Sequence, residues 1–233
     1  SPILHYLQYG VAKWLDPHPL FSTSFYLSRY RDVADSGMNP LLHYLDYGIA
    51  EDRMPCPLFD PVYYRLRSRT AIGHQVPIVQ LMASQENYRV SPHPLFDCDY
   101  FLGNWGATAV MDQHPLVAYL HDPAARRISP HPLFDSTYYL DASHDIDAAN
   151  INQLVHFLQY GADEKRDPNP LFSVSFYRST QKDVLASSIN PLVHFVLHGD
   201  AELRDPHPLF QMEYYREQFK GDCADANGTL FAS

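Results

Sequence analysis

Apolar and polar residues follow one another along this chain in the pattern of short amphipathic helices. After Asn39, the segment PLLHYLDYG places Leu41, Tyr44 and Leu45 on one helical face at three- and four-residue spacing. Asn39 is a good N-cap, and Pro40 suits the first helical position. The pattern therefore predicts a helix of about two turns, which is too short to be stable without packing against neighbours.

The same pattern returns six times. Pro-Leu-Phe begins at six prolines separated by 38, 37, 38, 38 and 38 residues: Pro19, Pro57, Pro94, Pro132, Pro170 and Pro208. The helix motif keeps this period, as PILHYL, PLLHYL, PIVQLM, PLVAYL, QLVHFL and PLVHFV. A fixed period in this range is typical of stacked helical repeats.

Glycines occur where the first helix of most units is expected to end: Gly10, Gly48, Gly161 and Gly199. We expect each to close its helix in the left-handed conformation that glycine adopts readily. The third and fourth units depart from the pattern, because Gln85 and Pro123 replace the glycine. There, Val76 and His114 replace the capping asparagine.

A second helix is expected after each Pro-Leu-Phe, with these N-caps: Ser22, Asp60, Asp97, Asp135, Ser173 and, less suitably, Gln211. The phenylalanine before the cap should then pack on the ring four positions into the helix, forming a hydrophobic staple. The predicted pairs are Phe21 with Tyr26, Phe59 with Tyr64, Phe96 with Phe101, Phe134 with Tyr139, Phe172 with Tyr177 and Phe210 with Tyr215.

No segment alternates between apolar and polar residues for longer than a few positions, so strands are not expected. The prediction is an all-α protein, an α-solenoid of six ~38-residue repeats with two or three short helices each. The expected units form a single array over residues 1–233: 2–39, 40–76, 77–114, 115–152, 153–190 and 191–228. Because residue 2 already lies inside a unit, we expect a fragment of a longer protein.

Composition and charge argue against several classes of protein function. The chain is 45% hydrophobic and 19% charged, which is too apolar for intrinsic disorder. Its formal net charge of −10 argues against nucleic-acid binding, which needs clusters of Lys and Arg. No apolar run reaches the length of a membrane span, and direct membrane insertion is not expected. Three widely spaced cysteines, Cys56, Cys98 and Cys223, favour a reducing, cytoplasmic compartment.

The combination NPLLHYLDYGIAEDRMPCPLFDPVYYRL, residues 39–66, resembles a tandem repeat of bacterial cell-surface polysaccharide glycosyltransferases and rhamnan-synthesis-type proteins. The resemblance covers all six units. It implies an accessory segment in glycan biosynthesis, at the inner face of the membrane with a polysaccharide assembly complex. It implies a catalytic neighbour and not an activity of these residues.

The thirteen histidines are mostly periodic, and periodicity favours a structural role over a metal site. His194 and His198 are four apart but lack the acidic partner and third ligand of a zinc site. The chain also lacks a nucleophile elbow, a phosphate-binding glycine loop and a dinucleotide fingerprint. We therefore expect no catalytic residue, no metal and no cofactor. Three repeated Glu-x-Arg pairs, at Glu51, Glu164 and Glu202, are interpreted as loop clamps.

The aromatic residues, 14% of the chain, offer the best candidates for binding. Adjacent rings on a helix point about 100° apart, so one ring of each Tyr-Tyr pair can be stapled while the other faces outward. Sugar rings stack on such aromatics, and the candidates for a glycan or protein partner are Tyr63, Tyr138, Tyr214, His43, His156 and His194. The alternative is a protein scaffold or oligomerisation spacer without affinity for sugar.

Overall fold

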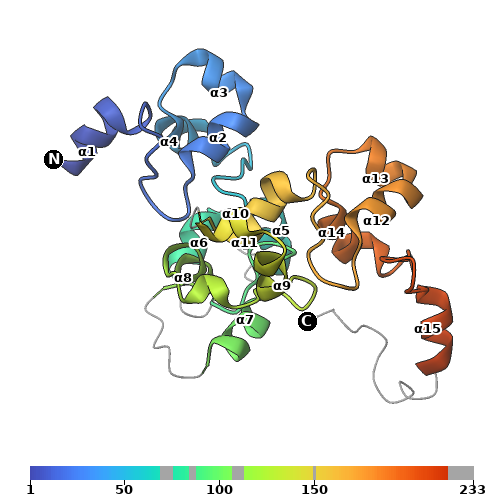
Figure 1. Cartoon of the computed structure of the whole chain (residues 1–233). Coiled ribbons are helices and arrows are strands. Elements are labelled where there is room, and N and C mark those ends of the chain that lie inside the picture. The colour runs from blue at the N-terminus through green and yellow to red at the C-terminus, as the bar shows by residue number, and fades with distance from the viewer. Residues whose placement is uncertain (69–75, 84–87, 107–112, 149–150, 220–233) are drawn as a thin grey trace. The chain divides into compact units, whose positions relative to one another are not determined.

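The structure is a computed structural model that describes residues 1–68, 76–83, 88–106, 113–148 and 151–219. Over these residues it contains fifteen α-helices, none longer than eight residues, and no strand (Figure 1). The predicted all-α class is confirmed. The chain divides into two compact units, Ser1–Gln159 and Tyr160–Ser233. Gln85 and Cys223, named above, lie outside the described residues.

The first helix of each sequence unit follows an N-cap and usually continues from an α-helical into a π-helical turn. Asn39, Asn152 and Asn190 accept backbone N–H bonds at its start, and His114 does so through its imidazole. These helices are α1 (Pro2–His5) with η1 (Tyr6–Gly10), α4 (Pro40–His43) with η2 (Tyr44–Gly48), α6 (Pro77–Ala83), α8 (Pro115–His121), α11 (Gln153–His156) with η5 (Phe157–Gly161) and α14 (Pro191–His194) with η6 (Phe195–Gly199).

The second helix begins after a serine or aspartate whose side chain accepts a backbone N–H two or three residues on, in five of its six copies. These helices are α2 (Thr23–Arg29), α5 (Pro61–Arg67), α7 (Cys98–Trp105), α9 (Ser136–Asp141), α12 (Val174–Thr180) and α15 (Met212–Phe219). Further short helices lie between the two types: α3 (Arg31–Ser36), η4 (Ala125–Arg127), α10 (His144–Ala148) and α13 (Lys182–Ala186).

The core is built from clusters of three aromatic rings. In α2, Tyr26 lies 5.4 Å from Phe21, measured between ring centroids, and both rings contact Tyr44 of the next first helix at 5.8 and 5.7 Å. The stapled pair is in contact at all six predicted positions, at 5.2 to 5.6 Å. The full cluster recurs with Tyr119, Phe157 and Phe195 as the third ring.

Backbone hydrogen bonds accompany these ring clusters. The N–H of the capping residue donates to a proline carbonyl in the next sequence unit, as in Ser22 to Pro55 at 2.9 Å. The other copies are Asp60 to Pro92, Asp97 to Pro130 and Ser173 to Pro206. The cap therefore fixes both the start of its own helix and the position of the following Pro-x-Pro-Leu-Phe segment.

The expected left-handed glycine caps are wrong. Among the described glycines only Gly37 and Gly106 have positive φ, whereas Gly48 lies inside the π-helical turn. A Cβ on Gly48 would collide with the hydroxyl of Tyr26, and one on Gly199 with the hydroxyl of Tyr177. Glycine is therefore present because the tyrosine of the preceding second helix passes too close for a side chain.

The left-handed residue of this region comes four residues after the end of the helix and is not a glycine. Asp52 has φ 53°, and the N–H of Arg53 donates to the carbonyl of Gly48 at 2.8 Å. This six-to-one bond around a left-handed residue is the Schellman arrangement. The same conformation occurs at Trp14, Lys165 and Leu203.

The tight approach at Gly199 gives a stability prediction. Gly199→Ala inserts a methyl group against the Tyr177 hydroxyl and the Phe195 ring, and overpacking of this kind lowers the free energy of unfolding by about 1–3 kcal/mol. Urea unfolding followed by circular dichroism measures the change. Adding Tyr177→Phe, which removes the colliding oxygen, should recover part of the loss.

Gly103→Ala is the matched control. Gly103 lies within α7, and a Cβ at this residue would meet no atom within 4 Å, so alanine there should raise stability by up to about 1 kcal/mol. Equal effects of the two alanines would contradict the packing explanation.

Candidate functional site

The histidines that directly precede Pro-Leu-Phe stabilise a turn by accepting a backbone hydrogen bond. In His18, His93, His131 and His207 the imidazole Nδ1 accepts the backbone N–H of the leucine two residues on, each at 3.1 Å. In the fifth unit Asn169 makes the same bond through its side-chain oxygen at 2.8 Å. The ring therefore serves as a turn-forming acceptor, a role that an amide can also fill.

Two of these histidines are held neutral. His93 and His131 are buried, and burial lowers the pKa of His93 to about 3 and that of His131 to about 4. The protonated form of each ring would lose its hydration on burial, and no carboxylate interaction is strong enough to offset that loss. They are suited to packing, and neither is accessible to a ligand.

The candidate histidines of the first helix bond the stapled tyrosine of the preceding second helix. The Tyr139 hydroxyl lies 2.9 Å from His156 Nδ1, and the corresponding distances are 3.0 Å for Tyr26 with His43 and for Tyr177 with His194. His156 and His194 are buried, and His43 is half-buried. These three candidates therefore satisfy tyrosine hydroxyls in the interior.

At one junction in the middle of the chain, both the tyrosine and the histidine of this pair are replaced. Phe101 stands where the tyrosine is expected, and Ala118, 17 residues later, where the histidine is expected. Both are buried. Losing the hydroxyl and the imidazole together leaves neither polar group unpaired, which is the less costly change in an apolar interior.

In the C-terminal unit the tyrosine–histidine pair extends into a longer polar chain. His194 Nε2 lies 3.7 Å from Asp183, and Asp183 accepts a bond from Arg204 at 2.8 Å. The order Tyr177, His194, Asp183 superficially matches an acid–base relay. However, burial raises the pKa of Tyr177, so its hydroxyl is a weaker acid than a free tyrosine and is fully buried. This series of contacts links α12, α13 and α14 of the C-terminal unit.

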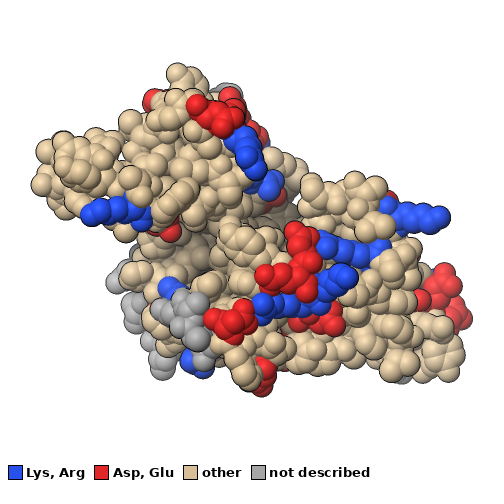
Figure 2. All heavy atoms as spheres, turned by 45° about the horizontal axis from the view of Figure 1, so that its top comes forward, with Lys and Arg blue, Asp and Glu red and all other residues tan. Residues whose placement is uncertain are grey.

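Arginines after the left-handed residues clamp the loops. Arg53 donates to Glu51 and to both oxygens of Asp32, and its guanidinium lies 4.8 Å from the centre of the Tyr30 ring. Arg204 repeats the arrangement with Glu202 and Asp183, and Arg166 pairs with Glu164. In the view of Figure 2, acidic and basic side chains adjoin in small groups and most of the face is uncharged.

The three candidate tyrosines do not share one environment. Tyr63 is half-buried, and burial raises its pKa, while the Arg67 guanidinium lies 5.8 Å from its ring. Tyr138 is half-buried, and Tyr214, in the C-terminal unit, is 66% exposed. Sequence reasoning placed these rings and the three histidines in one set, but the structure places them in different environments.

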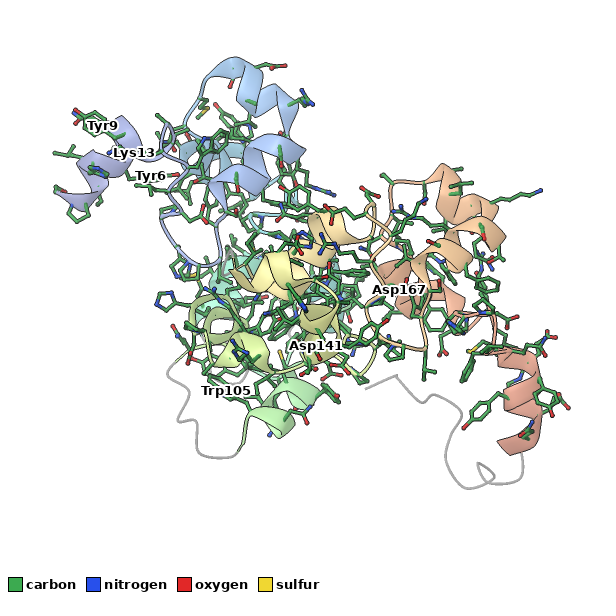
Figure 3. The ribbon with its side chains drawn as sticks, in the orientation of Figure 1. Tyr6, Tyr9, Lys13, Trp105, Asp141 and Asp167 are labelled. Carbon is green, nitrogen blue, oxygen red and sulfur yellow. The ribbon has the colours of Figure 1, made fainter. Side chains whose placement is uncertain are left out.

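Sequence reasoning missed a more consistent set of exposed rings. Tyr9, Tyr47 and Tyr160 each precede the glycine of a first helix, and they are 53%, 54% and 56% exposed. Tyr9 lies on the helix that begins the chain, beside Lys13, whose amino group is 6.0 Å from the ring (Figure 3). The Tyr-Gly dipeptide was visible in the sequence, but its exposure depends on how the helix packs.

Other features of the described residues offer little chemistry. A hollow of about 440 Å³ in the N-terminal unit is lined in part by His18, Cys56, His121 and Asn152. Burial raises the pKa of the Cys56 thiol to about 12, so it is a poor nucleophile. Among the described residues, no group of three or more His, Cys, Asp or Glu could hold a metal ion, and no helix could cross a membrane.

No family model, curated protein or solved structure matches the chain.

The buried histidines predict an acid-sensitive fold. In the unfolded chain, the imidazoles of His93 and His131 have the ordinary histidine pKa of about 6.5. In the folded chain, burial lowers the pKa of His93 to about 3 and that of His131 to about 4. The unfolded state therefore binds more protons than the folded state below about pH 6.5. Above that pH the two histidines leave the free energy of unfolding unchanged, and below it they lower this free energy. Between pH 7 and 5 each should lower the free energy of unfolding by about 2 kcal/mol, measured by urea unfolding.

Asparagine provides the matched test, because Asn169 makes the same turn bond. The double variant His93→Asn with His131→Asn should flatten the pH dependence, and Asn169→His should steepen it. A wild-type chain equally stable at pH 7 and 5 would contradict the assignment of these histidines as buried and neutral.

Proposed function

We propose that the chain is a non-catalytic α-solenoid of six ~38-residue units that acts as an interaction segment in bacterial surface-polysaccharide assembly. The solenoid is supported by the recurrence of the ring cluster, the tyrosine–histidine bond and the cap-to-proline bond at the sequence period. Each unit then covers the aromatic ring of its neighbour, as stacked repeats require.

The observation that carries the non-catalytic proposal is the tyrosine–histidine bond. It places the residues most suited to acid–base chemistry, including His156 and His194, inside the packing, with their tyrosine partners fully buried. A catalytic pair would need to contact substrate. The enzyme of such a system would therefore lie in another domain or another protein, as the resemblance implies.

The rings proposed to bind are the tyrosines before glycine, Tyr9 and Tyr47 in the N-terminal unit and Tyr160 in the C-terminal unit, each of which would contact the partner separately. An exposed tyrosine offers an apolar face for a sugar ring and a hydroxyl for hydrogen bonding. This proposal replaces the candidate histidines with rings that solvent reaches. The proposed partner is a surface glycan held for an associated glycosyltransferase at the inner face of the membrane.

A second candidate is a protein scaffold without affinity for sugar. The burial of His156 and His194 favours it, because it removes polar groups that a glycan-binding ladder was expected to offer. Exposed aliphatic residues near the tyrosines, such as Leu45 at 55%, also suit a protein surface.

The solenoid predicts that one whole unit can be removed. Deleting residues 153–190 joins Asn152 to Pro191, which recreates an Asn-Pro helix start and returns a histidine to 17 residues after Tyr139. The shortened chain should keep its helical circular dichroism and unfold cooperatively at lower urea, because the nearest-neighbour contacts are preserved.

Deleting only residues 153–171 is the control, because it breaks the period. That chain should lose cooperative unfolding. If both deletions behave alike, the units do not stack as proposed.

Isothermal titration with polysaccharide from the surface of the host separates the two candidates. We expect saturable binding that the double variant Tyr47→Ala with Tyr160→Ala weakens at least tenfold, while Tyr138→Ala at a half-buried ring leaves affinity unchanged in folded protein. Binding that both variants retain in full would overturn the assignment of the surface. The absence of binding heat at high micromolar protein would overturn the proposed glycan binding and favour the protein scaffold.

A further inference from the structure

The hollow of about 440 Å³ in the N-terminal unit is lined by two parts of the chain that are far apart in sequence. One part supplies Asp16, His18 and Cys56, and the other supplies Leu120 and Arg126. Small-molecule sites in proteins have volumes of roughly 300–1,000 Å³. The hollow is therefore large enough to hold a small ligand.

One wall of the hollow departs from the repeat at Cys56. The residue between the two prolines of this motif is larger in the other five units: His18, His93, His131, Asn169 and His207. Cys56 is buried and lines the hollow, so a histidine side chain in its place would occupy part of that space. The room in the hollow therefore depends on a small residue at this position.

A second wall departs from the repeat at Arg126. This arginine belongs to η4 (Ala125–Arg127), which follows Pro123 in a unit whose expected glycine is replaced. Its Nη2 donates to the carbonyl of Leu120 at 3.0 Å, and the side chain is half-buried. The irregular unit thus places a cation at the hollow and fixes it by a backbone bond.

The polar groups of the first wall are also held in place. Asp16 accepts the backbone N–H of Thr23 at 2.7 Å, and His18 Nδ1 accepts that of Leu20 at 3.1 Å. Burial lowers the pKa of His18, which favours the neutral ring, and its proton is then on Nε2. The hollow therefore combines one carboxylate, one guanidinium and one imidazole N–H donor.

This combination favours an uncharged ligand with many hydroxyl groups. The opposite charges of Asp16 and Arg126 require no net charge on the ligand, and a hydroxyl can donate to the first and accept from the second. The remaining wall includes apolar surface from Pro17, Pro19, Pro57, Leu120 and Val155. A sugar ring matches both properties, because it carries hydroxyls at its edge and C–H groups on its faces.

We propose that this hollow binds a single uncharged hexose, whose hydroxyls contact Asp16, His18 and Arg126. The site is separate from the exposed tyrosines and adds a pocket for one sugar residue. It rests on the proposed function only for the source of that sugar, which would be a residue of the glycan. Binding of free hexose can therefore succeed or fail independently of binding by the tyrosines.

Titration of the intact chain with glucose, galactose and mannose, followed by heteronuclear NMR spectra, tests the proposal. At least one of these hexoses should give saturable shifts of signals from the hollow, with a dissociation constant of about 1 mM, as expected for a small polar ligand. Glucuronate and glucosamine, which carry a charge, should bind more weakly than the uncharged sugar. Tighter binding of either charged sugar would overturn the assignment of ligand class.

The chain itself supplies substitutions that keep the turns. Cys56→His introduces the residue of four other units and should abolish binding by filling the hollow. Asp16→Ser removes the carboxylate but keeps the turn, because Ser91 and Ser129 accept the same backbone N–H seven residues on. Loss of a hydrogen bond to a charged group should weaken binding roughly tenfold in this variant.

Arg127→Gln is the control, because Arg127 neighbours Arg126 in η4 but is exposed and does not line this hollow. It should bind the hexose as the wild type does, and so should the double variant Tyr47→Ala with Tyr160→Ala. Circular dichroism melts confirm that each variant is folded. The proposal fails if no hexose saturates at tens of millimolar, or if folded Asp16→Ser or Cys56→His retains full affinity.

Discussion

The packing of a stapled Phe–Tyr pair on the aromatic ring of the next first helix is the interaction on which the rest of this structure depends. No α-helix of the described residues exceeds eight residues, and helices of that length are unstable alone in water. Tyr26, Tyr139 and Tyr177 are fully buried only because the following first helix covers them. Stability therefore resides in junctions between neighbours and not within single helices.

This constraint explains features that first suggest chemistry. The first-helix histidine is present because a buried tyrosine hydroxyl needs a partner, and the glycine because that hydroxyl passes close to the backbone. Where phenylalanine replaces the tyrosine at residue 101, the histidine is absent as well. Histidine, glycine and tyrosine thus occur together at the junctions of Tyr26, Tyr139 and Tyr177, whereas Tyr64 is followed by Gln80 in place of the histidine. Their joint occurrence is consistent with a structural role for these three residues.

The predicted acid sensitivity also follows from burial. His93 and His131 shape turns that are buried in the fold, so their rings lose water when the chain folds. An amide at Asn169 shows that the turn itself needs only an acceptor. The charge state of the histidines is therefore a property of packing and not of the turn.

Local signals in the sequence determined the helices, their caps and the stapled rings, because these depend on residues within a few positions of one another. Asn39 and Asp60 cap helices as their sequence predicts, and the all-α class follows from the same pattern. The role of Gly48 and the exposure of Tyr47 were decided by tertiary structure, because both depend on a tyrosine or helix face brought from another unit. The burial of the candidate histidines was decided in the same way, because only the folded chain brings His156 to Tyr139, 17 residues away.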